Sequence, residues 1–155
     1  MSEEVRRLTA DDLASNEMHA LMRAAAGLPE AEIRRILAEE LPGMVVLGTG
    51  GEGHPSSMAA CVVHLDRVLL EYLAVSAASR WRGIGGRLVR QVARLGTPVV
   101  AETADDAVGF YRKLGFLVTP APEDPRWPGA ARYRCVLGRE PADDAGKLSG
   151  TPTGH

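Results

Sequence analysis

Positive charge and glycine are concentrated in the stretch Arg80–Arg87. Its three arginines and three glycines are Arg80, Arg82, Arg87, Gly83, Gly85 and Gly86. Glycine has no Cβ, so the backbone there can approach a ligand closely. The stretch opens a helical pattern, and the first N–H groups of a helix lack internal partners and carry the positive end of its dipole. These residues therefore predict a site for an anion such as phosphate.

Two common phosphate loops do not fit this stretch. The nucleotide P-loop needs Lys and then Ser or Thr after its last glycine, whereas Arg87 and Leu88 follow Gly86. In the dinucleotide fingerprint, counted from Gly83, the third glycine would fall on Leu88. A nucleotide-binding α/β domain of either kind is therefore disfavoured.

Glu71 is the one ionisable residue inside an apolar run, Val68–Val75. Burying an unpaired carboxylate is costly, so its side chain must face a cleft, a partner or water. Burial would raise its pKa toward neutrality, which suits a general base. A carboxylate paired with an arginine at the sheet surface is the structural alternative.

Hydrophobic periodicity predicts the elements that would position these residues. The run Val68–Val75 has the composition of a buried strand. After the glycines, apolar residues recur at helical spacing, and these are Ile84, Leu88, Val92 and Leu95. A strand therefore leads into a glycine-rich turn that opens a helix.

Further elements are expected on both sides of this unit. Strands are predicted at Val5–Thr9, Met44–Gly48, Ser57–Leu65, Val99–Glu102, Phe116–Thr119 and Ala131–Leu137. Helices are predicted after Asp11 or Asp12, after Pro29, and after Asp105 or Asp106, with the acidic residues as caps. Pro120–Gly129 is rich in proline and is expected to be a loop. From Glu140 onward periodicity is lost, which predicts a disordered tail over 140–155.

Two motifs, in this order, are similar to those of a known family. Arg80-x-x-Gly83-x-Gly85-Gly86 resembles the acyl-CoA pyrophosphate loop of the GCN5-related N-acetyltransferases, the GNAT superfamily. Further along, Ala107-x-x-Phe110-Tyr111-x-x-Leu114-Gly115-Phe116 resembles the signature helix that follows the family's fifth strand. The resemblance implies a GNAT fold of the α/β (α+β) class in a single domain over 1–139. Its central sheet would be mixed and mostly antiparallel, with six to seven strands and about four flanking helices.

The resemblance also implies acetyl-CoA as co-substrate, an amine acceptor and direct attack in a ternary complex. In the family, the splayed ends of the fourth and fifth strands form the cleft. By position, Leu73, Ala74 and Val75 would contact the pantetheine arm. The pyrophosphate would lie against Arg80, Trp81, Arg82, Gly83, Ile84, Gly85 and Gly86.

Two catalytic roles follow from the same resemblance. Tyr111 matches the tyrosine that in many members returns a proton to the departing thiolate, and in others only hydrogen-bonds the cofactor sulfur. Glu71 stands where members commonly have a general base. Relatives often carry a bulge in this strand, so alternation does not decide which way Glu71 points. The alternative for Tyr111 is a ring that only packs beside Phe110.

The family often has Asn where this chain has Ala104, so one cofactor contact is in doubt. A non-catalytic acyl-CoA-binding or sensing module on the same fold is therefore the rival hypothesis. Acceptor contacts are expected from Met22–Glu30, from the hairpin of the third strand and from Pro120–Gly129. A small amine, an aminoglycoside-like drug, an amino acid and a protein terminus all remain open as acceptors.

Composition narrows the classes of partner. The chain has 155 residues with 45% hydrophobic and 25% charged residues, as in ordinary soluble domains. A formal net charge of −2 gives no case for nucleic acid as the main partner. The absence of a long apolar segment and of metal-ligand spacing predicts a cytoplasmic enzyme without a membrane segment or a metal. Cys61 and Cys135 are expected to be buried free thiols, and a homodimer is left open.

Overall fold

The computed structural model describes residues 4–138, in which seven strands form one mixed sheet with the order β1-β2-β3-β4-β5-β7-β6. The strands are β1 (Arg6–Arg7), β2 (Val45–Gly51), β3 (His54–Val63), β4 (Val68–Val75), β5 (Val99–Thr103), β6 (Leu117–Ala121) and β7 (Arg132–Leu137). Only β4 and β5 run parallel, and every other neighbouring pair is antiparallel. The predicted mixed, mostly antiparallel sheet is therefore confirmed.

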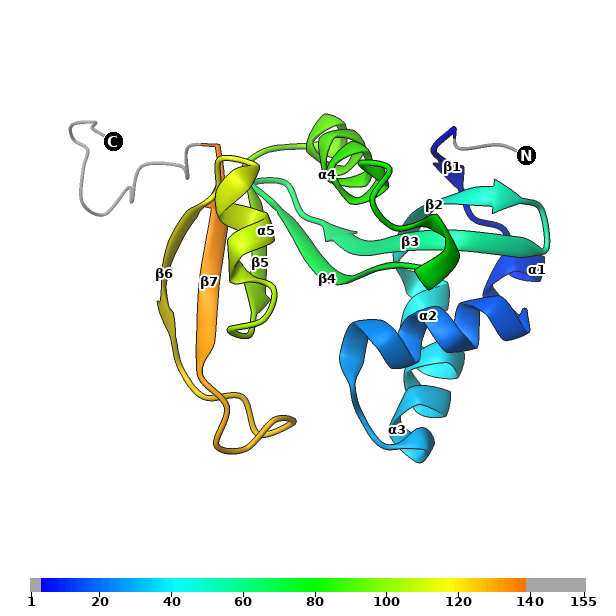
Figure 1. Cartoon of the computed structure of the whole chain (residues 1–155), viewed down its shortest axis with the longest axis horizontal. Coiled ribbons are helices and arrows are strands. Elements are labelled where there is room, and N and C mark those ends of the chain that lie inside the picture. Colours follow the sequence, from blue (N-terminus) through cyan, green and yellow to red (C-terminus); the bar gives the residue numbers. More distant parts are fainter. Residues whose placement is uncertain (1–3, 139–155) are drawn as a thin grey trace.

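Five α-helices accompany the sheet within the described residues. They are α1 (Ala10–Leu13), α2 (Asn16–Ala26), α3 (Glu30–Arg35), α4 (Ile84–Leu95) and α5 (Val108–Lys113). The π-helical turn η1 (Ile36–Glu40) and two 3-10 turns, η2 (Leu41–Gly43) and η3 (Ala77–Ser79), complete the set. In Figure 1, α4 lies on one side of the central strands, and α2 and α3 lie on the other.

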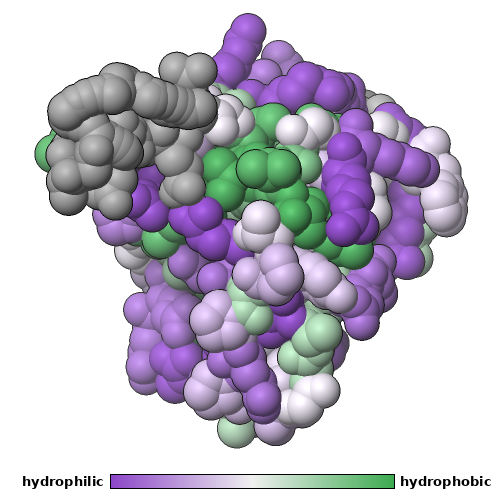
Figure 2. Space-filling model, turned by 90° about the vertical axis from the view of Figure 1, so that its left-hand side faces the viewer, coloured by the Kyte–Doolittle hydropathy of each residue, from purple (hydrophilic) through white to green (hydrophobic). Residues whose placement is uncertain are grey.

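The strand β6 forms one edge of the sheet and pairs only with β7. Pro120 lies within it, which an edge strand tolerates because no further strand needs the missing N–H. Figure 2 looks onto this end of the molecule, where hydrophobic residues gather between hydrophilic surfaces. Leu117 of β6 is 70% exposed.

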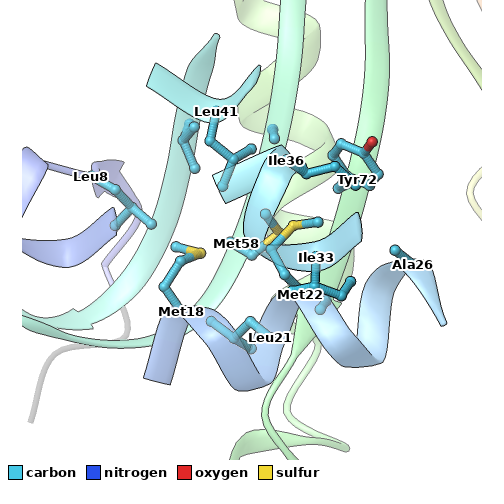
Figure 3. Close-up of a cluster of buried hydrophobic side chains, with 13 residues drawn as sticks. Leu8, Met18, Leu21, Met22, Ala26, Ile33, Ile36, Leu41, Met58 and Tyr72 are labelled. Carbon is cyan, nitrogen blue, oxygen red and sulfur yellow. The ribbon is translucent and has the colours of Figure 1, made fainter. Parts of the chain in front are cut away.

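Two hydrophobic clusters fill the two faces of the sheet. The first lies under α2, α3 and η1 and includes Met18, Met22, Ile33 and Met58 (Figure 3). The second lies under α4 and α5. Its members on those helices include Ile84, Leu88, Val92 and Tyr111. The helical spacing of Ile84, Leu88 and Val92 is part of the pattern that predicted α4.

The N-terminal helix differs from the prediction. Asp12 is not a cap residue, because Thr9 caps α1 and Asp12 completes a capping box three positions later. Ser15 then caps a separate helix, α2, so one predicted helix is two. Asp12 instead accepts hydrogen bonds from Arg6 Nη1 at 2.8 Å and from the Gly53 N–H at 2.7 Å. This carboxylate therefore joins β1, α1 and the β2–β3 turn.

The start of α5 also differs from the prediction. Neither Asp105 nor Asp106 caps it, since its first flanking residue is Ala107 and no side chain caps the helix. Asp105 instead accepts a 2.5 Å hydrogen bond from the hydroxyl of Tyr133. The end of α5 is as predicted, with Gly115 at a φ of 96° and Phe116 buried. The predicted tail over 140–155 lies outside the described residues.

Candidate active site

A cleft opens where β4 and β5 separate. The two strands pair from Val68 with Val99 as far as Leu70 with Ala101. Beyond this point they diverge (Figure 1), and a cleft of about 490 Å³ lies between them. Its walls include residues 24–27 at the end of α2, 70–75 of β4 and 102–104 at the end of β5. Parts of α4 and α5 and three residues between the end of β6 and the start of β7 complete them.

A β-bulge in β4 places Glu71 at the start of this separation. On β3, Ala60 pairs with Tyr72 and Cys61 pairs with Leu70, so Glu71 is the extra residue without a partner. The bulge reverses the alternation, because Leu70 belongs to the core cluster under α4 while Tyr72 belongs to the one under α2. Glu71 itself lines the cleft.

The surroundings of Glu71 disfavour its charge. Its side chain is open to solvent, but the cleft walls crowd it, and this partial desolvation raises its pKa above the ordinary value. Arg126 opposes the shift, and the carboxylates of Glu40, Glu102 and Asp124 add to it. Glu71 forms no ion pair within the described residues, so the alternative of a surface arginine partner is not what the structure shows.

Tyr111 lies deep on the opposite wall. It is 6% exposed, and its ring packs edge-on against Phe110 and Phe116 with centroid distances of 5.1 Å. Burial raises its pKa far above the usual value for a phenol, with a smaller contribution from Cys135. The residue still lines the cleft, so the packing role and a role at the cleft coexist in one side chain.

The glycine-rich turn lies beside the part of the cleft that Val75 and Gly85 line. Gly83 precedes α4 with a φ of 73° and caps it without a side chain, whereas α1 and α2 are capped by Thr9 and Ser15. The first helical bond of α4 runs from the Arg87 N–H to the Gly83 carbonyl. The N–H groups of its first turn are therefore open to an anion. Trp81, 98% exposed, has a φ of 68°.

The predicted cofactor residues divide into two groups. Leu73, Ala74, Val75 and Gly85 line the cleft. The remainder, Arg80, Trp81, Arg82, Gly83, Ile84 and Gly86, form the adjoining turn and the start of α4. Arg80 donates from Nε to the carbonyl of Val75 at 3.2 Å, so its side chain ties the turn to the end of β4. Ile84 is 2% exposed and offers only backbone.

Two residues of the cleft lining, and one that contacts the lining residue Tyr72, were not singled out from the sequence. Arg132, at the start of β7, lines the cleft and is 9% exposed. Trp127 lines it from the β6–β7 loop and donates from Nε1 to the carbonyl of Ala26 at 2.8 Å. Glu40 accepts a 3.2 Å hydrogen bond from the Tyr72 hydroxyl. Their segments lie far apart in the chain, so no local pattern indicated these contacts.

Comparison with known families identifies the class of this fold and cleft. A family model for the acetyltransferase (GNAT) domain matches residues 32–118. This match spans more than half of the chain, and the chain belongs to the GNAT acetyltransferase family. A comparison with curated proteins found no match.

Solved structures share the fold. A putative GNAT-family acetyltransferase from Desulfovibrio desulfuricans is 17% identical with a TM-score of 0.70, covering 88% of this chain and 98% of that chain. The ribosomal-protein-S18-alanine N-acetyltransferase from Escherichia coli is 18% identical with a TM-score of 0.65, covering 88% and 93%. A GNAT-family acetyltransferase from Elizabethkingia anophelis with acetyl-CoA bound is 17% identical with a TM-score of 0.61, covering 88% and 97%.

Over residues 4–138, none of the helices combines the length and the apolar character needed to span a bilayer. In the same residues, no three His, Cys, Asp or Glu side chains are grouped so as to hold a metal ion.

Proposed function

We propose that this protein transfers the acetyl group of acetyl-CoA to a primary amine on a small-molecule acceptor, by direct attack in a ternary complex. The observation that carries this proposal is the cleft between the diverging strands β4 and β5, which has Glu71 and Tyr111 on its walls and the uncapped start of α4 at its end. The solved acetyltransferase with acetyl-CoA bound supports the choice of co-substrate.

The end of β4 fits the pantetheine arm. Leu73, Ala74 and Val75 pair with β3 on one side, while β5 has already turned away on the other. Apart from the Val75 carbonyl, which accepts from Arg80 Nε, the N–H and C=O groups on one side of this backbone are therefore left for the amides of the arm. A backbone N–H near Leu73 would polarise the thioester carbonyl, as in an oxyanion hole.

The start of α4 fits the pyrophosphate. Gly83 has no side chain to occupy the space in front of the helix, and nothing lies within 4 Å of where its Cβ would be. The N–H groups of the first turn and the dipole of a 12-residue helix favour an anion there. Arg80 and Arg82, both exposed at the turn, add positive charge.

Glu71 and Tyr111 would handle the two protons of the reaction. Only the neutral form of an amine attacks a thioester. The carboxylate of Glu71, whose pKa is raised, can accept the proton of the amine. Tyr111 remains protonated over the whole working range and would donate to the departing thiolate. Direct attack is favoured because Cys61 and Cys135 are fully buried with raised pKa values, which leaves no reactive thiol for a covalent intermediate.

The burial of Tyr111 supports one rival function. A phenol that is 6% exposed and packed between two phenylalanines could serve only the core. The protein would then bind acyl-CoA without turning it over, as a sensing module. Measurable acetyl transfer to any amine rejects this rival.

Calorimetric binding of acetyl-CoA and of CoA tests the proposal. Gly86 is a suitable position at which to introduce a charged side chain, because the structure has room for one. A Cβ at Gly86 would lie 3.4 Å from Leu114 Cδ2, which is an ordinary contact. Gly86→Glu places a carboxylate in the first turn, where the dipole tolerates it but the pyrophosphate is repelled. We expect saturable binding to the wild-type protein and a loss of roughly tenfold or more in Gly86→Glu.

Gly86→Gln is the matched control, since it adds the same bulk without the charge. It should retain clearly more affinity than Gly86→Glu. Absence of binding of any acyl-CoA to the folded wild-type protein would reject the proposed function. Equal affinities of the two variants would reject the assignment of the pyrophosphate to this turn.

A further inference from the structure

Arg132 places a buried positive charge in the wall of the cleft. Arg132 is the first residue of β7 and is 9% exposed. It lines the cleft together with Trp127 and Ala130. The other charged residues of the lining, Glu71, Glu102 and Asp106, are all acidic. A single guanidinium thus faces a cleft whose remaining charge is negative.

The guanidinium of Arg132 forms no ion pair with any described residue, although Asp124 lies near enough to interact with it electrostatically. No carboxylate of residues 4–138 lies within 4 Å of it, and its fully buried Nε has no hydrogen-bond acceptor. The nearby Asp124 is already bound by Arg126, through Nη2 at 2.8 Å and through the backbone N–H at 2.9 Å. Arginine has five N–H donors and is always charged, so an unmatched buried guanidinium calls for an acceptor.

The stacking of Arg132 orients its donors. Its Cζ lies 4.4 Å from the centroid of the Trp127 ring. Contact with a ring face holds the guanidinium plane but occupies none of its N–H groups. Trp127 is itself fixed, because its Nε1 donates to the carbonyl of Ala26 at the end of α2. The charge is therefore presented from a wall made by α2, the β6–β7 loop and β7.

We propose that Arg132 binds a carboxylate of the acceptor, so that the substrate class of this site is amines that also carry a carboxylate, such as amino acids. This inference rests on the proposed acetyl transfer. A zwitterionic acceptor matches both signs in the cleft, since its amine faces the acidic residues while its carboxylate pairs with the guanidinium. A phosphate dianion would bring two negative charges to one arginine among three acidic residues, which disfavours it.

A paired panel of acceptors tests the inference without any mutation. It contains α- and ω-amino acids, each beside its own carboxamide, and release of CoA from acetyl-CoA is measured with a thiol reagent. The two members of a pair share size and amine, so the ratio of kcat/KM isolates the carboxylate. We expect the acids to be favoured by roughly tenfold to hundredfold, as for a charged hydrogen-bonded pair.

Substitution of Arg132 locates the effect. In Arg132→Gln the KM for the preferred acid should rise to the value of its carboxamide, while the carboxamide itself changes little. Arg132→Lys keeps the charge but loses the planar fork, and should recover part of the preference. Arg94→Gln is the control, because Arg94 is an exposed arginine in the last turn of α4 outside the cleft lining, and the acid-to-amide preference should persist in it.

The possible negative results distinguish an error in the carboxylate assignment from an error in the proposed acetyl transfer. Equal kcat/KM for acids and amides, or a loss in Arg132→Gln that affects both alike, overturns the carboxylate assignment while the transferase stands. The same holds if acetyl-CoA binds but no carboxylate-bearing amine is acetylated or shifts the melting temperature of the CoA complex. Failure of acetyl-CoA itself to bind would instead reject the proposed function.

Discussion

Gly85 of α4 lies against the ring of Phe110 in α5: a Cβ at Gly85 would be 3.1 Å from Cε1 and 3.2 Å from Cζ of that ring. These distances are shorter than ordinary van der Waals contacts, so the ring would have to move. Phe110 also lines the cleft and packs against Tyr111. The close approach of the two helices therefore depends on a glycine at this position.

The neighbouring glycine provides the matched comparison for a stability test. Replacing a helical glycine by alanine gains up to about 1 kcal/mol of helix propensity where there is room. Gly86→Ala should therefore be at least as stable as the wild-type protein. Gly85→Ala should be less stable than Gly86→Ala, because displacement of Phe110 offsets the gain. Chemical denaturation of both variants measures this, and equal unfolding free energies would contradict the packing argument.

The hydroxyl of Tyr111 can be removed without removing the ring. Tyr111→Phe keeps the volume between Phe110 and Phe116, so we expect little change in melting temperature or in acetyl-CoA affinity. Loss of the proton donor should lower kcat by roughly 10²–10⁴-fold, the usual range for acid–base groups. Steady-state acetylation of any accepted amine gives the answer. An unchanged kcat would leave Tyr111 a packing residue only.

Glu71 should control the acidic side of the pH–rate profile. As a base it must be ionised, and desolvation raises its pKa, so kcat/KM should fall as the pH drops through that raised value. In Glu71→Gln the rate should be low and this dependence should be absent. Glu102→Gln removes another carboxylate of the cleft and should keep the acidic limb, moved to slightly lower pH because Glu102 contributes to the raised pKa of Glu71. A profile that is unchanged in Glu71→Gln would exclude the base role.

The same carboxyl predicts an effect of pH on stability. Because its pKa is raised in the folded protein, its contribution to stability is fully present below the unfolded pKa and is lost as the pH rises through the folded pKa. Denaturation of wild-type protein and Glu71→Gln over a pH series should thus show the variant gaining relative stability toward higher pH. A constant difference would indicate a carboxyl without a shifted pKa.

Asp12 should be a main stabilising residue of the N-terminal part. Its side chain is fully buried and accepts from Arg6, from Thr9 and from the Gly53 N–H. Asp12→Asn breaks the ion pair and should cost about 2 to 4 kcal/mol of unfolding free energy. Asp11→Asn, at the exposed neighbouring position, is the control and should change stability by less than about 0.5 kcal/mol.

The effect of Asp12 should also depend on pH in a defined direction. Arg6 first, and then hydrogen bonds from Thr9 and Gly53, hold the pKa of this carboxyl far below its ordinary value. Its stabilisation is therefore complete above the unfolded pKa of about 4 and is lost as the pH falls toward the folded pKa. The stability difference between wild-type protein and Asp12→Asn should shrink in acid, as thermal unfolding at several pH values would show.

The glycine-rich turn and the helix α4 that it opens were predictable because their signals are local. The glycines before α4 and the apolar spacing within it lie in one short segment. The bounds of β4, Val68–Val75, also follow from a continuous apolar run. Family membership followed from two such segments in the right order.

Helix starts were predicted less well, although their signals are also local. Thr9 rather than Asp11 or Asp12 caps α1, and Asp12 lies at the third helical position, where it accepts from both the Thr9 N–H and Arg6. The contact with Arg6 exists because the fold places β1 beside α1. Sequence spacing alone does not reveal the second partner.

Only the tertiary structure decided the orientation and environment of the chemical groups. The direction of Glu71 depends on a bulge defined by pairing with β3, and the depth of Tyr111 depends on Phe116 and on the sheet behind it. The wall that presents Arg132 joins Trp127 to Ala26, residues 101 positions apart. Hydrophobic periodicity indicates which face of its own helix or strand a residue occupies. The burial, the charged neighbours and the hydrogen-bond partners of a cleft residue come from segments that are remote in the chain.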